Sequence, residues 1–235
     1  MPFWSGGSLP APTRVTLILL LSLPLSLQLL ASHRSGIPTT DLELTVVLSG
    51  ELLIGLAAGL IVRACHATAA GAGQIASMTM GLGFAQSIDP MTGANTTALG
   101  RLLLTFAGIL FFATDIHLLL LKTLELSFNV IPAGELNHLE ARLSQLPELG
   151  TRFFRAAFSL SAPVTLAALL AYAVLAAISK VSPQINLFAI GFAITIAAGI
   201  IVMYFSMPDI LAKLSTEYQR LPADIMIWLR TGEVR

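Results

Sequence analysis

Three groups of side chains in this sequence have types suited to chemistry: Glu51, the adjacent Cys65 and His66, and Asp115 with His117. A cysteine beside a histidine raises the question of a thiolate nucleophile, but adjacent residues of a helix do not face each other. Asp115 and His117 are two positions apart, so on a helix their side chains point about 200° away from each other. The chain has neither G-x-S-x-G nor H-E-x-x-H, and its cysteine and histidines lack the spacing of a zinc site. We therefore predict a protein that is not an enzyme, with no catalytic residue, cofactor site or metal site.

The elements that must position these residues are strongly apolar. Of 235 residues, 55% are hydrophobic and 11% are charged, and the mean hydropathy is +0.82. This composition is typical of a membrane protein. The net charge is zero, so nothing in the overall charge points to nucleic acid. We predict a single all-α membrane domain that covers residues 1–235.

Five apolar segments are predicted to be helices, and a helix needs roughly 20 residues to cross the hydrocarbon layer. The shortest contains Pro24 and follows Arg14, so a signal peptide is the alternative for it. If all five segments alternate, Lys and Arg divide nine against four, which favours a cytoplasmic tail and a cytoplasmic 122–155 loop. An amphipathic tail over 208–235 follows the last segment. The segments are 15–30, 44–62, 102–121, 156–178 and 185–207.

Acidic residues lie within two of the apolar segments. Glu51 and Asp115 each cost roughly a few kcal/mol at the bilayer centre unless they are paired or face water. A buried acid at this depth therefore indicates either a functional site or a buried tie between helices. The ties that the sequence offers are Glu51 with Lys180, and Asp115 with Arg101.

Residues 71–100 read "GAGQIASMTMGLGFAQSIDPMTGANTTALG", with six glycines and a single charge, Asp89. The glycines from Gly81 onward loosen a helix, and a residue before a proline, here Asp89, disfavours helical geometry. A new helix is predicted near Thr96 or Thr97, a suitable cap. Irregular backbone at membrane depth is tolerated only inside protein or beside a water-filled cavity. The composition predicts a re-entrant loop in a pore, with the broken helix of a secondary transporter as the alternative.

Three ordered blocks of the sequence resemble one protein family. They are "GELLIGLAAGLIVRACHATAAGAGQIASMTMGLGFAQSIDPMTG" (50–93), "FATDIHLLLLKTLELSFNVIPAG" (112–134) and "KVSPQINLFAIGFAITIAAGI" (180–200). Together they resemble the FliR family of the flagellar export gate, and the SctT-type proteins of injectisomes are similar. The resemblance is collinear and covers nearly all of 37–207. "GLGFA" is more typical of flagellar members, and the injectisome gate is the alternative.

The resemblance implies a fold, a location and partners. Members of the family form helical hairpins that need not span the bilayer conventionally. They assemble with FliP-type and FliQ-type subunits into the entry portal for unfolded flagellar proteins, in the inner membrane at the flagellar basal body. Export components of the FlhB and FlhA types are further partners. An internal repeat, which a secondary transporter should show, is absent between 44–80 and 156–192.

The resemblance also implies roles for particular residues. One block corresponds to a loop that plugs the closed channel, here Met80, Gly81, Leu82, Gly83, Phe84, Ala85, Asp89, Pro90 and Gly93. We predict that a second set of charged and neighbouring residues serves assembly, namely Glu51, Arg63, Arg101, Asp115, His117, Lys180, Pro183 and Gln184. Small residues on apolar segments predict faces that await other subunits; these are Ala57, Ala58, Gly59, Ala69 and Gly71.

Three departures from the family pattern carry expectations of their own. The family has a further apolar helix before residues 10–15, so we expect either a misplaced start codon or a truncated member. Ala193 stands where a proline is common, which predicts a straighter helix there. Ile116 replaces a glycine before His117, which weakens any role carried over to that histidine.

Overall fold

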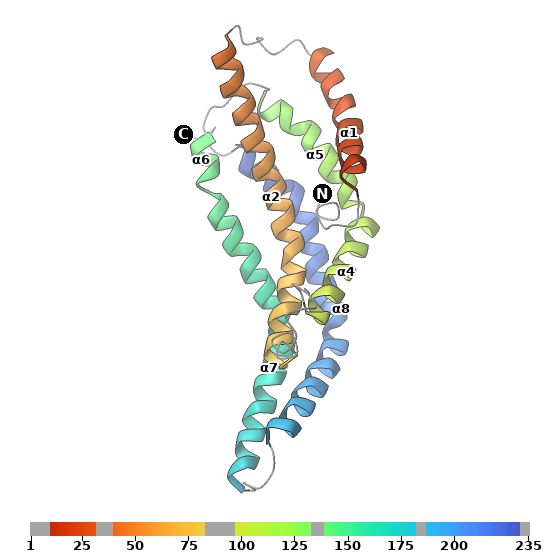
Figure 1. The fold of residues 1–235 in the computed structure, drawn as a ribbon, viewed down its shortest axis with the longest axis vertical. Helices are drawn as coiled ribbons and strands as arrows, with labels where there is room; N and C mark the ends of the chain where they lie inside the picture. Colours follow the sequence, from red (N-terminus) through yellow and green to blue (C-terminus); the bar gives the residue numbers. More distant parts are fainter. Residues whose placement is uncertain (1–9, 32–39, 83–96, 133–138, 182–186, 231–235) are drawn as a thin grey trace. The chain divides into compact units, whose positions relative to one another are not determined.

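The computed structural model describes residues 10–31, 40–82, 97–132, 139–181 and 187–230. Every regular element within these ranges is a helix, which confirms the predicted all-α fold (Figure 1). Three helical stretches are long and apolar enough to cross a membrane, and α4 with α5 makes a fourth if that pair counts as one span. The helices are α1 (Ala11–Ala31), α2 (Asp41–Thr79), α4 (Ala98–Ala113), α5 (Ile116–Val130), α6 (Leu139–Leu143), α7 (Leu146–Val181) and α8 (Leu187–Arg230).

Helix α2 is longer than the apolar segment predicted at 44–62. Asp41 and Glu43 lie in its first turn, where negatively charged side chains stabilise a helix by interacting with the positive end of its dipole. The helix then continues through Gly71 and Gly73 to Thr79, and α4 begins at Ala98. Residues 71–79 and 98–100 of the predicted 71–100 loop region are therefore helical. Glycine weakens an isolated helix, so packing against neighbours must compensate here.

The prediction of one continuous helix over 102–121 is wrong. Helix α4 ends at Ala113, and Asp115 adopts a left-handed conformation with φ 54° before α5 begins at Ile116. The Leu110 carbonyl accepts from both the Thr114 amide at 3.0 Å and the Thr114 hydroxyl at 2.7 Å, so the regular pairing of α4 is kept up to Thr114. Aspartate is one of the few residues that tolerates this conformation, so Asp115 here has a local structural role.

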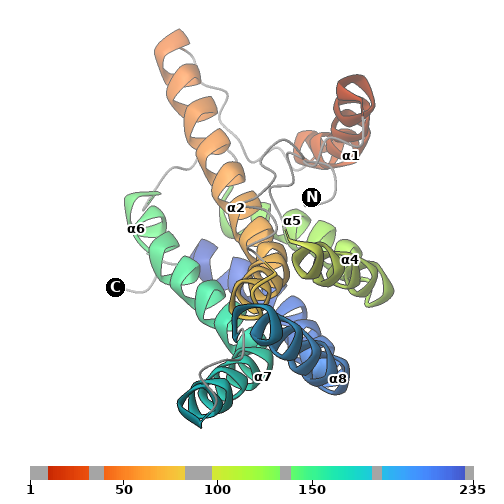
Figure 2. The same cartoon turned by 60° about the horizontal axis from the view of Figure 1, so that its bottom comes forward.

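Helices α7 and α8 extend the predicted segments 156–178 and 185–207. The predicted amphipathic tail from 208 is not a separate element up to Arg230, because α8 runs without interruption from Leu187 to Arg230. Within residues 151–218 the two helices are antiparallel neighbours (Figures 1 and 2). Arg152 pairs with Glu217 near one end, and a Cβ built at Gly191 would lie 3.5 Å from Leu175 near the other.

The chain divides into two compact units, and unit 1 contains residues 1–64, 115–150 and 219–235. Its best-defined packing joins α6 to the end of α8. The Nε of buried Arg142 donates to the Leu229 carbonyl at 2.9 Å, and the Nε1 of Trp228 donates to the Arg142 carbonyl at 2.8 Å. The last carbonyls of a helix lack intrahelical donors, so Arg142 satisfies one of them for α8.

Unit 2 contains Cys65–Thr114 and Thr151–Tyr218, and the C-terminal half of α2 (65–79) is its central helix. This half contacts α4 through Gly73, α7 through Thr68 and α8 through His66. Figure 2 shows this part of α2 among α4, α7 and α8. Buried positions recur along it at spacings of three or four residues, namely Cys65, Ala69, Ala72, Ala76 and Met80.

Two of the small residues predicted to await other subunits are already packed within unit 2. Ala69 is fully buried, and a Cβ built at Gly71 would lie 3.5 Å from Ala157 of α7. Ala57, in unit 1, is also buried at 4% exposed, so the prediction is wrong for Ala57, Ala69 and Gly71. For Ala69 and Gly71 the physical reason is that α7 runs along the same part of α2, which the apolar pattern alone does not reveal.

Candidate functional site

The candidate site consists of the two helix ends that flank residues 83–96. Met80, Gly81 and Leu82 follow the last turn of α2, and Thr97 precedes the first turn of α4. Both ends belong to unit 2 and are fixed by contacts with other helices of that unit. The predicted plug residues Gly83, Phe84, Ala85, Asp89, Pro90 and Gly93 lie outside the described residues, so their role stays a prediction.

Met80 rests on one face of α8. Its side chain is fully buried, and a Cβ built at Gly199 would lie 2.6 Å from its Sδ, Cγ and Cε atoms. The Thr195 hydroxyl, also buried, donates to the Met80 carbonyl at 3.2 Å. A side chain at position 199 would displace Met80, so the glycine at 199 creates the space that Met80 fills.

Gly81 turns the chain away from α2. Its φ is +87°, a conformation that residues with a Cβ rarely adopt. A Cβ there would also lie 2.5 Å from the ring of Phe192 on α8. The Gly81 amide donates to the Met78 carbonyl at 3.1 Å and closes the turn. Both backbone conformation and contact therefore require glycine at this position.

The face of α8 that receives this turn has a simple sequence signal. Thr195 and Gly199 are four residues apart and so lie on one side of the helix. Gly191, one turn before Thr195, has Leu175 of α7 as its close neighbour. Small residues at this spacing let another backbone approach closely. Sequence reasoning did not single out "GFAITIAAG", although the pattern was readable in it.

The other end of the site is a capped helix start. The Thr97 side chain accepts a hydrogen bond from the Gly100 amide at 3.2 Å, which confirms the predicted cap at this residue. The Thr97 amide donates to Oε1 of Gln74 on α2 at 3.2 Å. A Cβ built at Gly73 would lie 2.6 Å from the Leu99 carbonyl and from backbone atoms of Gly100. Helices α2 and α4 therefore meet at backbone distance here, and this contact fixes the return of the chain.

A buried polar pair lies further along the same helices. Nδ1 of His66 and the hydroxyl of Tyr218 are hydrogen-bonded at 2.7 Å, and Tyr218 also packs edge-on against Phe111 at 5.6 Å. The pair joins α2, α4 and α8. The hydrogen bond to Tyr218 gives His66 a structural role in the packing of these helices. The two residues are 152 positions apart, and nothing local in the sequence pointed to the pairing.

The residues predicted to serve assembly have different exposures. Arg63, Arg101, Asp115 and Lys180 are exposed and Glu51 and His117 are half-buried, while Pro183 and Gln184 lie outside the described residues. The ties proposed from sequence, Glu51 with Lys180 and Asp115 with Arg101, would each join the two units and stay predictions. Unit 2 does contain an ion pair that sequence reasoning did not single out, Arg152 with Glu217 at 3.1 Å.

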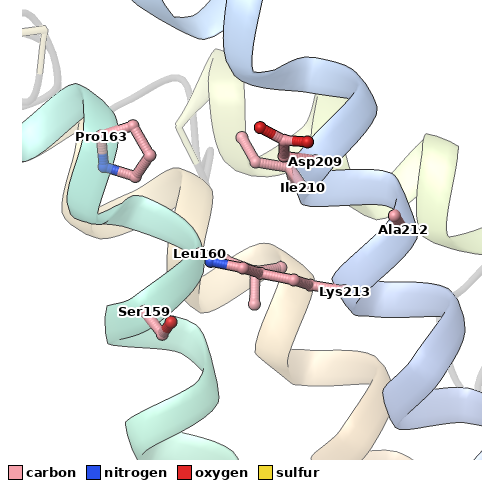
Figure 3. Close-up of a pocket in the computed structure, with 7 residues that line it drawn as sticks. All are labelled: Ser159, Leu160, Pro163, Asp209, Ile210, Ala212 and Lys213. Carbon is pink, nitrogen blue, oxygen red and sulfur yellow. The ribbon is translucent and has the colours of Figure 1, made fainter.

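A surface groove of about 230 Å³ lies between α7 and α8 (Figure 3). Because proline has no amide hydrogen, Pro163 cannot donate to the Ser159 carbonyl, and the regular bonding of α7 is interrupted beside the groove. Asp209 and Lys213, both exposed, lie one turn apart on the α8 side. No histidine is among the lining residues to activate Ser159, and no set of three possible metal ligands occurs in the part of the chain that the structure describes.

Comparison with known proteins places the chain in a family. The family model described as "Bacterial export proteins, family 1" matches residues 1–221. The chain is 29% identical over 229 residues to the flagellar biosynthetic protein FliR of Escherichia coli K12, which covers 96% of this chain and 86% of that protein. It is 30% identical over 224 residues to the protein of the same name in Aquifex aeolicus VF5, covering 93% and 83%. The resemblance inferred from the three sequence blocks is confirmed: the chain belongs to family 1 of the bacterial export proteins, the family of FliR.

Proposed function

We propose that this chain is a membrane component of the bacterial flagellar protein export apparatus. The observation that carries this proposal is the family match over residues 1–221, together with FliR relatives that align over nearly the whole chain. Helices long and apolar enough to cross a membrane support it. The role is one of transport and structure rather than catalysis.

The more specific proposal is that the chain helps to form the export channel. It would assemble with FliP-type and FliQ-type subunits in the inner membrane at the flagellar basal body. FlhB-type and FlhA-type components and the exported, unfolded flagellar proteins would be its further partners. All the relatives reported above are flagellar, which favours this assignment over an injectisome gate.

Residues 83–96 would act as the plug of the closed channel. The geometry that supports this role is the fixing of both flanking ends, Met80 on α8 and Thr97 on α2. Holding both ends reduces the conformational entropy that the connecting segment loses when it takes up one position. The seal must yield to an exported chain, and a few buried apolar side chains at ~1.5–3 kcal/mol each would suffice.

Ion conductance of the assembled complex tests the plug. Deletion of residues 83–86 should leave assembly with FliP-type and FliQ-type subunits intact and should raise the conductance of membranes that contain the complex. Removal of the last four residues, 232–235, is a control of equal length and should leave the conductance low. An assembled deletion complex that stays sealed would refute the plug, and failed assembly would support a packing role for the segment instead.

The broader assignment has its own test. A flagellar export component should restore motility to a bacterium that lacks its own FliR. It should also be encoded beside genes for FliP-like and FliQ-like proteins. Restored injectisome secretion without restored motility would favour the injectisome alternative, and solute uptake by the chain alone would favour a transporter.

A further inference from the structure

We propose that Thr195 is a positioning residue that fixes the C-terminal end of α2 on α8. Met80 lies directly after the last residue of α2, and its side chain is fully buried. The last carbonyls of a helix have no intrahelical donor, and a buried carbonyl without a partner costs as much free energy as a lost hydrogen bond. The position of the Met80 carbonyl is therefore sensitive to whichever donor reaches it.

Thr195 supplies a donor from α8. Its hydroxyl lies 3.2 Å from the Met80 carbonyl, and it is 3.0 Å and 3.2 Å from the carbonyls of Gly191 and Phe192 in its own helix. The two acceptors in α8 already belong to a continuous helix that provides amide donors for them. The contact with Met80 is the one that joins two helices, so it is the contact through which the hydroxyl positions α2.

The surroundings of Thr195 match the shape of the turn that it holds. One turn further along α8, Gly199 leaves the space that the Met80 side chain fills, and Phe192 lies against Gly81. Gly81 has φ +87° and sends the chain away from the end of α2. The fit of Met80 beside Gly199 and of Gly81 beside Phe192 therefore places the end of α2 against this face of α8. The hydroxyl of Thr195 fixes the position of the Met80 carbonyl along α8.

This inference rests on the proposed function in one respect. If residues 83–96 plug the channel, the Thr195 contact sets the point from which the plug starts, and its loss loosens the seal. The contact itself involves only described residues of unit 2 and can be tested without any assumption about the plug.

The test measures how accessible position 82, which is half-buried in the chain itself, is in the assembled complex. Leu82→Cys is introduced together with Cys65→Ala, and the rate of labelling by N-ethylmaleimide is followed. Adding Thr195→Val removes the hydroxyl and keeps the side-chain shape, and it should raise the rate about fivefold or more, the factor that corresponds to one lost hydrogen bond. If Thr195→Val does not assemble, Thr195→Ala replaces it with the same expected result.

Two further variants separate positioning from general loosening. Thr195→Ser keeps the hydroxyl and should restore the parent rate. Thr216→Val is the matched control, because the exposed Thr216 hydroxyl bonds the Ala212 carbonyl of its own helix at 3.0 Å, and it should leave the rate unchanged. An unchanged rate in Thr195→Val, or an equal increase in Thr195→Ser, would overturn the inference.

Conductance of the same complexes distinguishes this inference from the proposed plug. Faster labelling in Thr195→Val together with a sealed 83–86 deletion complex would refute the plug and support the positioning role. Unchanged labelling together with a leaking deletion complex would refute the positioning role and support the plug.

Discussion

Both halves of α2 contain glycines and alanines, but the surroundings of these small residues differ. In the N-terminal half (41–64), Gly55 and Gly59 are exposed, and no described residue lies within 4 Å of a Cβ built at either position. In the C-terminal half (65–79), a Cβ at Gly73 would lie 2.6 Å from the backbone of α4. Small residues permit close helix packing in both halves. Gly73 has its neighbour within the described chain, whereas Gly55 and Gly59 lie on an open face of a half in which Ala57 and Ile61 are buried.

This difference shows what small residues in an apolar helix do and do not determine. Lipid tails are as apolar as leucine, so association between helices depends on close van der Waals contact and on hydrogen bonds. Gly55 and Gly59 have the spacing on one helix that allows such contact, and Gly73 makes such a contact with Gly100 of α4. Which helix makes the contact is decided by chain topology. We expect the face of the N-terminal half that carries Gly55 and Gly59 to be completed by another subunit.

The largest expected effect comes from placing the same side chain on both halves. Gly73→Leu should destabilise unit 2 by about 3 kcal/mol or more, because the contact is with backbone and the core is already filled. Gly59→Leu should leave the chain itself intact and reduce recovery of the complex with FliP-type and FliQ-type subunits. Chain abundance in membranes and recovery of the purified complex measure the two effects. Equal loss of the chain in both variants would remove the distinction between the halves.

A smaller effect is expected at the end of the C-terminal half. Gly81→Ala forces a side chain into a left-handed conformation, which costs about 1–2 kcal/mol, and its Cβ would also press on Phe192. Gly150→Ala in α7 is the control, because no described residue lies within 4 Å of that Cβ, and it should stabilise the helix by up to about 1 kcal/mol. Thermal unfolding of the detergent-solubilised complex measures both. Similar melting temperatures for the two variants would show that the turn at Gly81 is not fixed.

The polar contact of the C-terminal half gives a third prediction. Tyr218→Phe removes the hydroxyl that bonds buried His66 and should cost about 1–3 kcal/mol. Tyr204→Phe is the matched control at a side chain that is 75% exposed, and it should have no measurable effect. The same thermal unfolding experiment applies. If both variants unfold like the parent, the C-terminal half is held by shape alone.

The smallest effect is expected for a contact that does not involve α2. Arg152 and Glu217 join α7 to α8 and are 34% and 18% exposed, so the pair is partly screened by solvent. Arg152→Gln should cost about 0.2–1 kcal/mol, and the cost should shrink at high salt. A loss as large as that of Tyr218→Phe would mean that the ion pair between α7 and α8 stabilises unit 2 as much as the buried polar contact of α2 does.

The sequence was sufficient to predict the parts of the fold that depend on composition and local pattern. Mean hydropathy indicated a membrane protein, the apolar segments located the long helices, and Thr97 was recognisable as a cap because its side chain acts within one turn. The family resemblance also followed from the sequence blocks. These features depend on neighbours in the chain, which is why a single sequence reveals them.

Features that depend on distant residues could not be predicted in this way. The break at Asp115 is a conformation that aspartate tolerates without requiring it, so no local signal marked it. The contact between His66 and Tyr218 joins residues 152 positions apart. The four-residue spacing of Thr195 and Gly199 was visible in the sequence, but their contact with Met80 was not.

Site-specific photo-cross-linking within the assembled complex tests the central comparison most directly. The photoreactive residue p-benzoylphenylalanine would replace either Leu56, which is 60% exposed in the N-terminal half, or Ile75 in the C-terminal half. After irradiation, we expect position 56 to form an adduct with another subunit and position 75, which is half-buried within unit 2, to form none. An adduct from position 75, or none from position 56, would contradict the assignment of the C-terminal half to the chain's own fold and of the open face of the N-terminal half to partner subunits.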